Sequence, residues 1–325
     1  MSRFLVIGDL HLDGKVGNKK VVDFFVNIEN EIIKHIDNVD HIILLGDYGM
    51  TPKLDNPYRK ILSEFIFKLN KPIICLLGQH DRDMTGHILQ PLMPLLKQLK
   101  VVEDVYDFKD CTFISHDRDI EALEKKIKKA KGKYVFGHFN INSYNTGDVT
   151  LESNIYVETK GKKFYLGDIH KHQKNGDIIY IGSVAPVSLG QLDYDFKVLI
   201  LDTESGKEQW IKLDHGTEIL RIDDTKEGKE DGIEDGADLS NTRIIVKIRD
   251  PKQKIEWRKD LSGRNYLSLE FESADKNIEK ITVDFNMKLS DIIVEYLDMM
   301  GKLHLKKKIM EYVKEAKKWK RKKLR

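Results

Sequence analysis

The sequence is poor in cysteine and has no long apolar run, and each shortage excludes a class of protein. Its two cysteines, Cys75 and Cys111, are too few for a disulfide framework and do not form a zinc-type pair. Both lie in apolar runs, so we expect buried free thiols in a reducing compartment, the cytoplasm. No apolar run approaches the roughly 20 residues that span a bilayer, and the first residues enter a strand-like run. We therefore expect neither a membrane segment nor a signal peptide.

A nucleotide-binding loop is also missing, because nothing in the 325 residues matches Gly-x-x-x-x-Gly-Lys-Ser/Thr. Any ATP-driven step would therefore have to come from a partner. With 40% hydrophobic and 33% charged residues, the chain has the composition of a globular protein. Its length is sufficient for two or three domains with a sizeable core.

The net charge of +2 is unevenly distributed along the chain. Residues 302–325 hold twelve Lys or Arg against Glu311 and Glu315, about +10, which leaves about −8 for the rest. An asymmetry of this kind is typical of an interaction tail.

Five apolar runs each end in a glycine that possible metal ligands follow at once. The motifs after these runs are Gly8-Asp9-Leu10-His11, Gly46-Asp47, Gly78-Gln79-His80-Asp81, Gly137-His138 and Gly167-Asp168-Ile169-His170. A single such motif is more often a polar turn after a core strand. Strands of an α/β sheet, however, gather their ligands beyond their carboxyl ends, and carboxylate with imidazole suits zinc, manganese or iron. The recurrence therefore predicts a metal site along one rim of a sheet.

In order and spacing, these motifs resemble the signature of the calcineurin-like metallophosphoesterases over residues 1 to about 200. The resemblance implies an α/β fold of four layers, a β-sandwich flanked by helices, with two metal ions at the strand ends. Residues 134–139, 167–173 and 180–183, with Pro186 and Gly190 after them, are similar to the SbcD-type recombination nucleases and their phage counterparts. This closer resemblance implies a DNA exonuclease or endonuclease, the nuclease subunit of an SbcC/SbcD-like recombination and repair complex.

The resemblance also implies a role for each motif residue. The implied ligands are Asp9, His11 and His170 for the first ion, Gln79, His138 and Asp168 for the second, and Asp47 as the bridge between them. His80 would lie beside the phosphate and protonate or stabilise the departing oxygen. Asp81 would fix the His80 tautomer through a hydrogen bond.

The sequence departs from the family pattern at three positions. Gln79 replaces the usual asparagine, and Asp168 replaces the first histidine of the Gly-His-x-His motif. Both changes fall on the second ion. Gln79 keeps the amide oxygen, and Asp168 makes the ligand set richer in oxygen, which favours Mn²⁺, with Mg²⁺ as the alternative, over zinc. Met50 stands where nucleases of this family often carry a histidine, so exonuclease polarity stays open. His172 is interpreted as a rim residue, and histidines outside the motifs, such as His116, are assigned to surface or helix positions.

Two other functions stay open at this stage. The first is a phosphatase or small-molecule phosphodiesterase of the same superfamily, although the Gly-Asp-x-Val-Asp-Arg-Gly continuation of the phosphatase motif is missing after Gly46-Asp47. The second is a catalytically weakened subunit that keeps the fold but has lost the second ion.

Apolar periodicity predicts alternating strands and helices, typical of a layered α/β protein. Helices are expected near 19–36, 58–69 and 119–131, and a short helical segment within 84–100. The expected strands are 40–45, 72–77, 111–115, 134–137, 154–158, 163–167, 178–182, 196–202 and 209–213.

The chain beyond residue 213 is expected to contain separate parts. The predicted division is a nuclease domain at 1–213, an acidic linker or loop at 214–241, a small α+β capping domain at 242–288 and a basic helical segment at 289–325. The capping domain would hold strands at 243–248, 266–271 and 280–285 and a helix near 252–261. In SbcD-type proteins the cap shapes the DNA cleft, the last segment docks on an SbcC-type, SMC-like coiled-coil ATPase, and the nuclease domains form a homodimer. The alternative for residues 289–300 is a helix packed on its own domain, and the alternative for the basic tail is DNA binding.

Overall fold

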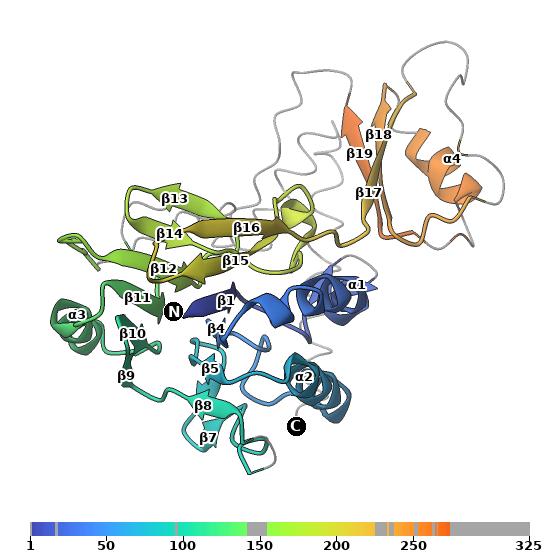
Figure 1. The fold of residues 1–325 in the computed structure, drawn as a ribbon. Helices are drawn as coiled ribbons and strands as arrows, with labels where there is room; N and C mark the ends of the chain where they lie inside the picture. Colours follow the sequence, from blue (N-terminus) through green and yellow to red (C-terminus); the bar gives the residue numbers. More distant parts are fainter. Residues whose placement is uncertain are drawn as a thin grey trace, which may run out of the picture. The chain divides into compact units, whose positions relative to one another are not determined.

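Two six-stranded mixed sheets form most of the computed structural model (Figure 1). The structure describes residues 2–16, 19–94, 97–141, 155–224, 233, 237–249, 253–261, 264 and 266–273. In spatial order, the first sheet contains β16 (Glu208–Lys212), β15 (Lys197–Asp202), β1 (Arg3–Ile7), β4 (His41–Leu44), β5 (Ile73–Cys75) and β8 (Leu99–Val101). The second contains β13 (Gln173–Asn175), β14 (Ile178–Tyr180), β12 (Lys163–Gly167), β11 (Tyr134–His138), β10 (Cys111–Ile114) and β9 (Val105–Phe108).

The central strands of both sheets are parallel, which places their carboxyl ends along one edge. In the first sheet, β1, β4, β5 and β8 pair in parallel, while β15 and β16 run antiparallel to their neighbours. In the second, β10, β11, β12 and β14 pair in parallel, with β9 and β13 as antiparallel edges. Residues that follow these parallel strands therefore meet at the same edge.

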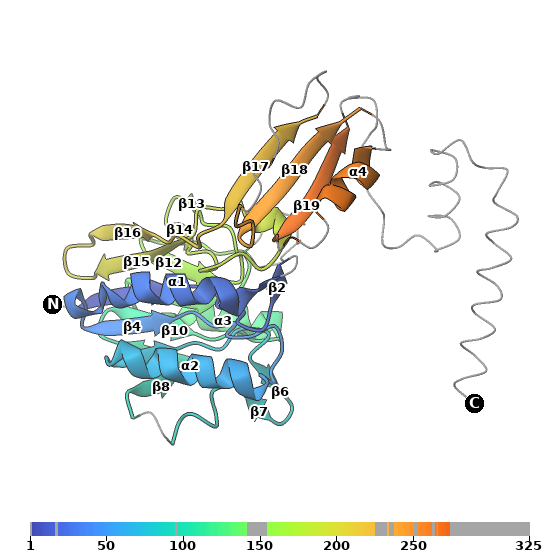
Figure 2. The same cartoon turned by 90° about the vertical axis from the view of Figure 1, so that its right-hand side faces the viewer.

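Strand residues alternate between two cores, as the period of two requires. Phe4 and Val6 point into the interior of the sandwich, where Phe113 and Phe136 of the second sheet meet them. Leu5 and Ile7 point to the other face, which the first two helices, α1 (Val21–Ile33) and α2 (Asn56–Leu69), cover. A third helix, α3 (Ile120–Lys129), covers the outer face of the second sheet. The layers are helices, sheet, sheet and helix (Figure 1), and Figure 2 looks onto the face that α1 and α2 cover, so the predicted fold class is confirmed.

The three long helices begin and end where the sequence places their signals. In α1, an apolar face made by Phe24, Phe25, Ile28 and Ile32 packs on the sheet. Asp119 caps α3 by accepting the Ala122 N–H at 3.1 Å. Pro57 lies in the first turn of α2, and Asn70, in the left-handed conformation, ends that helix.

Several predicted elements are wrong. The described part of the expected strand 154–158 is irregular, because β11 and β14 occupy both edges of β12. The segment 84–100 is not helical where it is described; it contains β7 (Gly86–His87), turns and β8, since Pro91 and Pro94 interrupt a helix. β7 pairs with β6 (Arg82–Asp83), and β2 (Lys15–Val16) pairs with β3 (Lys19–Lys20). Short helices, η1 (Ile36–Asn38) and η2 (Leu189–Gln191), complete the connections.

A third sheet lies beyond residue 213 and corrects the prediction of a linker there. It contains β17 (Glu218–Asp223), β18 (Thr242–Ile248) and β19 (Ser268–Ser273), with α4 (Gln253–Asp260) between the last two. β17 falls inside the expected linker 214–241, where it pairs in parallel with β18. Its buried Ile222 shares a small core with Val246 and Trp257. The expected strand 280–285 and the segment 289–325 lie outside the described residues.

Cys75 and Cys111 are buried free thiols, as predicted, and burial raises the pKa of each to about 12. Within the part of the chain that the structure describes, no helix has the length and apolarity to cross a membrane.

Replacing Phe136 by Ala should destabilise the sandwich by about 3–5 kcal/mol. Its fully buried ring stacks against Phe113 at 5.1 Å and Tyr165 at 5.4 Å, so truncation leaves a cavity between the sheets. Phe67→Ala is the matched control, because that ring is 71% exposed on α2 and its loss should change stability by less than about 0.5 kcal/mol. Urea unfolding of both variants measures the difference; equal changes would contradict the packing described.

Candidate metal centre

The five sequence motifs come together at the carboxyl edge of the two sheets. Asp9 and His11 follow β1, Asp47 follows β4, Gln79, His80 and Asp81 follow β5, His138 ends β11, and Asp168 and His170 follow β12. Three of these strands belong to the first sheet and two to the second. The site is therefore built where the same edges of the two sheets meet.

Asp47 lies at the centre of the group. Its Oδ2 atom is 3.4 Å from His138 Nε2, 3.7 Å from His11 Nε2 and 3.9 Å from His80 Nε2. These separations are longer than ordinary hydrogen bonds of 2.7–3.2 Å. Three imidazoles thus face one buried carboxylate, the arrangement expected of a residue that bridges two ions.

Asp9, His11 and His170 form a compact set of possible metal ligands. Their ligand atoms lie within 4.8 Å of one another, and the two Nε2 atoms are 3.0 Å apart. Burial lowers the pKa of His11 to about 3 and also lowers the pKa of His170. Both imidazoles are therefore neutral at pH 7, the form that binds metals. The three residues predicted for the first ion are thus brought together.

His138 presents one ring nitrogen to a second set. Its Nδ1–H donates to Leu45 O at 2.8 Å, so Nε2 is the nitrogen that carries the lone pair in the neutral ring. Nε2 is buried and has no hydrogen-bond partner among the described residues, although it lies 3.4 Å from Asp47 and 3.9 Å from Asp168. A buried ring nitrogen without a hydrogen-bond partner, beside two carboxylates, fits a cation: a proton on Nε2, or a metal ion that replaces it. The residues present therefore fit the second ion as well as the first.

Burial and mutual repulsion perturb the carboxylates of the site. Burial, with the nearby Asp47 and Asp168, raises the pKa of Asp9 to about 8, and burial also raises the pKa of Asp168. Burial would raise the pKa of Asp47 too, but the facing His138 outweighs it and holds that pKa well below its usual value. The same carboxylates raise the pKa of His138, although burial acts to lower it. The site concentrates negative charge that divalent cations would stabilise.

The backbone at the ligands is held in unusual conformations. His11, Asp47 and Asp168 have φ of 43°, 51° and 82°, in the left-handed region that costs non-glycine residues about 1–3 kcal/mol each. The glycines beside them are needed for space. A Cβ on Gly78 would lie 2.1 Å from Asp47 Oδ1, and a Cβ on Gly167 would lie 2.6 Å from Asp9 Oδ1. The recurrent glycine therefore lets carboxylates approach the backbone.

Asp81 has a different role from the predicted one. Its carboxylate does not orient the His80 ring; it accepts the backbone N–H of Asp47 at 2.6 Å, of Gly78 at 2.7 Å and of Tyr48 at 2.8 Å. Because Asp81 is completely buried under the turn after β4, these amides are the donors within its reach. Burial and Asp47 raise its pKa to about 7, and the N–H donors act in the opposite direction. Asp81 thus ties the turn after β5 to the turn after β4.

His80 and Gln79 lie at the mouth of the site. The His80 side chain is 37% exposed, and its backbone N–H donates to Asp47 Oδ1 at 3.0 Å. Gln79 is exposed, and its amide nitrogen lies 3.4 Å from His80 Nε2. The ligand role of Gln79 stays a prediction, whereas Asp47, His138 and Asp168 lie close together. Met50 is 40% exposed.

Two residues near the site were missed by sequence reasoning. The amide nitrogen of buried Gln191 lies 3.1 Å from His170 Nδ1 while its Oε1 accepts the Val187 N–H, so Gln191 fixes the position of the ring. Its position directly after Gly190 was the only signal. His116 is half-buried after β10, not on the surface or a helix, and burial with the nearby His138 lowers its pKa to about 4. His172 bonds Tyr180 O through Nδ1 at 2.9 Å and contacts Trp210.

Comparisons with known proteins identify a family for most of the chain. A sequence model described as calcineurin-like phosphoesterase matches residues 2–201. No curated protein sequence matches the chain. Among solved structures, an archaeal phosphodiesterase is 19% identical with a TM-score of 0.38, covering 65% of this chain and 99% of its own. A purple acid phosphatase from yellow lupin (Lupinus luteus) seeds is 12% identical with a TM-score of 0.39, covering 65% of this chain and 53% of its own.

Asp81→Asn should weaken Mn²⁺ binding by about 10–100-fold, the usual cost of losing a residue that supports ligands. The amide keeps one oxygen for three backbone donors and turns its NH₂ toward them, so the turn that presents Asp47 loses its anchor. Titration calorimetry measures the affinity, with Asp37→Asn, on an exposed position of η1, as the control. Unchanged affinity in Asp81→Asn would refute the anchoring role.

Proposed function

The chain belongs to the calcineurin-like phosphoesterase family, whose members are metal-dependent phosphoester hydrolases, and from this premise we propose that it is a DNA nuclease. More specifically, we propose the nuclease subunit of an SbcC/SbcD-like recombination and repair complex. The similarity of residues 134–139 and 167–173 to SbcD-type nucleases supports this assignment. The missing Gly-Asp-x-Val-Asp-Arg-Gly continuation after Asp47 disfavours a phosphatase.

One observation carries the proposal: a single buried carboxylate, Asp47, faces His11, His80 and His138 at 3.4–3.9 Å. Two of these imidazoles belong to two separate ligand sets, and the third opens to solvent. An arrangement of this kind can hold two cations and leave one histidine free to act on a bound ester.

We propose that Asp9, His11 and His170 hold one ion, that His138, Asp168 and Gln79 hold the other, and that Asp47 bridges them. The oxygen-rich second set favours Mn²⁺, with Mg²⁺ as the alternative. Bound divalent ions would neutralise the phosphate oxygens and supply a nucleophile at neutral pH.

His80 is the residue of the site best placed to move a proton. Its Nε2 atom lies 3.9 Å from Asp47 Oδ2, and its ring contacts that of His11 edge-on. The half-exposed ring borders both the buried ligands and the solvent side from which an ester enters. We propose that Nε2–H donates to the oxygen that leaves as the phosphodiester bond breaks. The hydrogen bond from the His80 backbone N–H to Asp47 Oδ1 holds the histidine close to the carboxylate proposed to bridge the two ions.

Activity should require a divalent ion and favour diesters over monoesters. The expected result is hydrolysis of bis-p-nitrophenyl phosphate with Mn²⁺, little hydrolysis of p-nitrophenyl phosphate, and no activity in EDTA. Calorimetry should find two Mn²⁺ per chain. A preference for the monoester would point to a phosphatase, and one ion with no hydrolysis would point to a weakened structural subunit; either result would contradict the proposal.

His80→Ala should keep the metals but lower diester hydrolysis by about 10²–10⁴-fold, the contribution typical of acid–base catalysis. The physical reason is that His80 lies at the mouth and contributes its backbone, not its ring, to the hydrogen bond with Asp47. Metal content and steady-state rates measure the two effects. His138→Ala is the contrasting variant, because loss of its buried Nε2 should lower metal content. Loss of metal from His80→Ala would make that histidine a ligand instead.

We further propose that residues 289–325 bind an SMC-like coiled-coil ATPase of the SbcC type. The chain has no nucleotide-binding loop of its own, and relatives with this order of motifs work beside an ATPase. The segment carries apolar residues at helical spacing, among them Leu289, Ile293 and Leu297, and ends in a basic run around Trp319. Apolar stripes of this kind dock in grooves of other proteins. DNA is the alternative partner of the basic run.

Truncation after Phe285 should abolish co-purification with the ATPase at high salt while bis-p-nitrophenyl phosphate hydrolysis persists. Apolar contacts survive high ionic strength, whereas phosphate contacts weaken steeply. If the truncated chain still retains the ATPase at high salt, the docking site lies elsewhere. If only DNA affinity at low salt is lost, the tail is a nucleic-acid contact.

A further inference from the structure

We propose that a cavity beside His80, lined by Arg82, His116 and Arg118, binds a second phosphate of the nucleic-acid strand, one that the enzyme does not cleave. This inference rests on the proposed nuclease function and names a substrate subsite for it. The cavity has a volume of about 230 Å³, and Asp83, Met84 and Asp117 complete its lining.

The cavity adjoins the metal centre through the chain and through hydrogen bonds. Arg82 begins β6 two residues after His80. On the other side, Ser115 and His116 follow β10 and are bonded to the residue just before Gly78. The Leu77 N–H donates to Ser115 Oγ at 2.8 Å, and the His116 N–H donates to Leu77 O at 2.8 Å. The lining is thus fixed to the same turn that carries His80.

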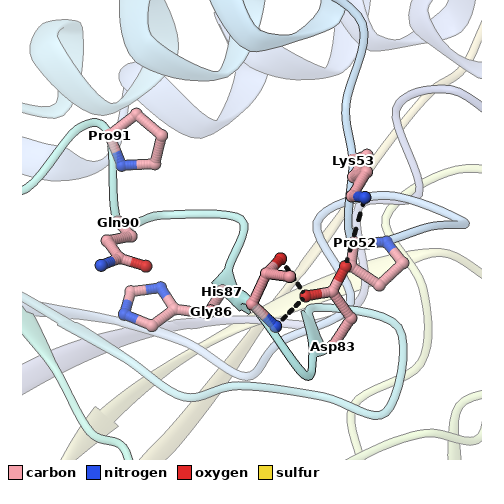
Figure 3. A pocket seen from close by; sticks show the side chains of 8 residues that line it. Pro52, Lys53, Asp83, Gly86, His87, Gln90 and Pro91 are labelled. Carbon is pink, nitrogen blue, oxygen red and sulfur yellow. Dashed lines mark hydrogen bonds and ion pairs between the residues drawn. The ribbon is translucent and has the colours of Figure 1, made fainter.

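Each of the two carboxylates of the cavity has a lysine partner outside it, and Lys126, the partner of Asp117, also pairs with Asp104. Asp83 lies 3.8 Å from Lys53 Nζ (Figure 3) and accepts the Thr85 N–H at 2.7 Å. Asp117 accepts from Lys126 Nζ at 2.5 Å and from the Asp119 N–H at 3.0 Å. Neither carboxylate forms a hydrogen bond or ion pair with Arg82 or Arg118 within the described residues.

The two arginines, in contrast, form no ion pair within the described part of the chain. Arg82 donates through Nη2 to a neutral acceptor, Glu103 O, at 3.1 Å, and its buried Nε has no partner. Arg118 is exposed and makes no hydrogen bond or ion pair within the described part of the chain. Two guanidinium groups at one small cavity form a site for an anion, and their planar forks match phosphate oxygens.

We infer that the anion is a phosphate of a nucleic-acid strand, because the arginines lie between the metal centre and the exposed Met84. The scissile phosphate belongs beside Asp47 and His80, and Arg82 is separated from His80 only by Asp81, so the cavity is reached by the neighbouring part of the same strand. Met84, at the turn of the β6–β7 hairpin, is 99% exposed and lines the cavity as well. A polarizable thioether beside a phosphate site offers contact to a base or sugar. Phosphate and apolar contact together fit a nucleotide.

Removing either arginine should weaken the hydrolysis of long substrates and leave the hydrolysis of small ones unchanged. Arg118→Gln and Arg82→Gln should each raise KM for an oligothymidylate about 10-fold with kcat unchanged. Each should also reduce the slope of log affinity against log salt by about 0.7, the value for one phosphate contact of a single strand. Hydrolysis of bis-p-nitrophenyl phosphate, which has one phosphorus, should match wild type. Arg82→Lys should restore part of the lost affinity because the charge is kept.

Arg3→Gln is the matched control, since Arg3 begins β1 at the end of the strand opposite to Asp9. Oligonucleotides with and without terminal phosphates separate two sources of the bound group. Equal losses on both assign an internal phosphodiester, and a loss confined to the phosphorylated strand assigns its terminus.

The subsite would be refuted if the arginine variants kept wild-type KM and salt slope, or if they lost bis-p-nitrophenyl phosphate hydrolysis to the same degree. Fluorescence anisotropy of labelled oligothymidylate separates failure of the subsite from failure of the proposed function, because it measures strand binding without cleavage. If the full chain binds the strand with an arginine-dependent slope but cleaves no DNA, the subsite stands and the nuclease proposal falls.

Discussion

The rest of the site depends on the hydrogen bonds that the Asp81 carboxylate accepts from the backbone. This carboxylate is buried without a counter-charge of its own and accepts three backbone N–H groups, from Gly78, Asp47 and Tyr48. Those bonds join the turn after β5 to the turn after β4. The turn after β4 then continues the network, because Asp47 O accepts the N–H groups of Leu10 and His11 at 3.0 Å. One carboxylate thus positions ligands that come from three strands.

This network lets the fold tolerate an unfavourable centre. Carboxylates and imidazoles are buried together, and three ligand residues adopt left-handed φ angles. Each of these features destabilises the folded chain, and bound divalent cations would offset the burial of the carboxylates. The aromatic interior between the sheets, where Phe113, Phe136 and Tyr165 stack, supplies the opposing stability. The packing of the aromatic interior, away from the site, therefore offsets the loss of stability at the site.

The charges at the mouth of the site differ from those in its buried centre. Lysines pair with the two carboxylates around the Arg82 cavity, and the two arginines that line it form no ion pair among the described residues. In the buried centre carboxylates lie close together, and burial, with the nearby Asp47 and Asp168, raises the pKa of Asp9 to about 8. Under the proposed function, a nucleic-acid strand would meet the arginines at the rim and the bound cations inside, and both would attract its phosphates.

The sequence alone determined the fold class, the helices α1, α2 and α3, and the gathering of Asp9, Asp47, His138 and their partners at one edge. These follow from local periodicity, from glycine followed by ligand types, and from the rule that parallel strands end together. Only the tertiary structure decided which groups Asp81 and Gln191 contact, where His116 lies, and that β17 is a strand. Those outcomes depend on partners distant along the chain: amides of another turn for Asp81, the β10 end for His116, and β18 for β17. Pairings of that kind leave no periodic trace in the sequence, because each partner satisfies its hydrogen bonds only once the sheets have packed.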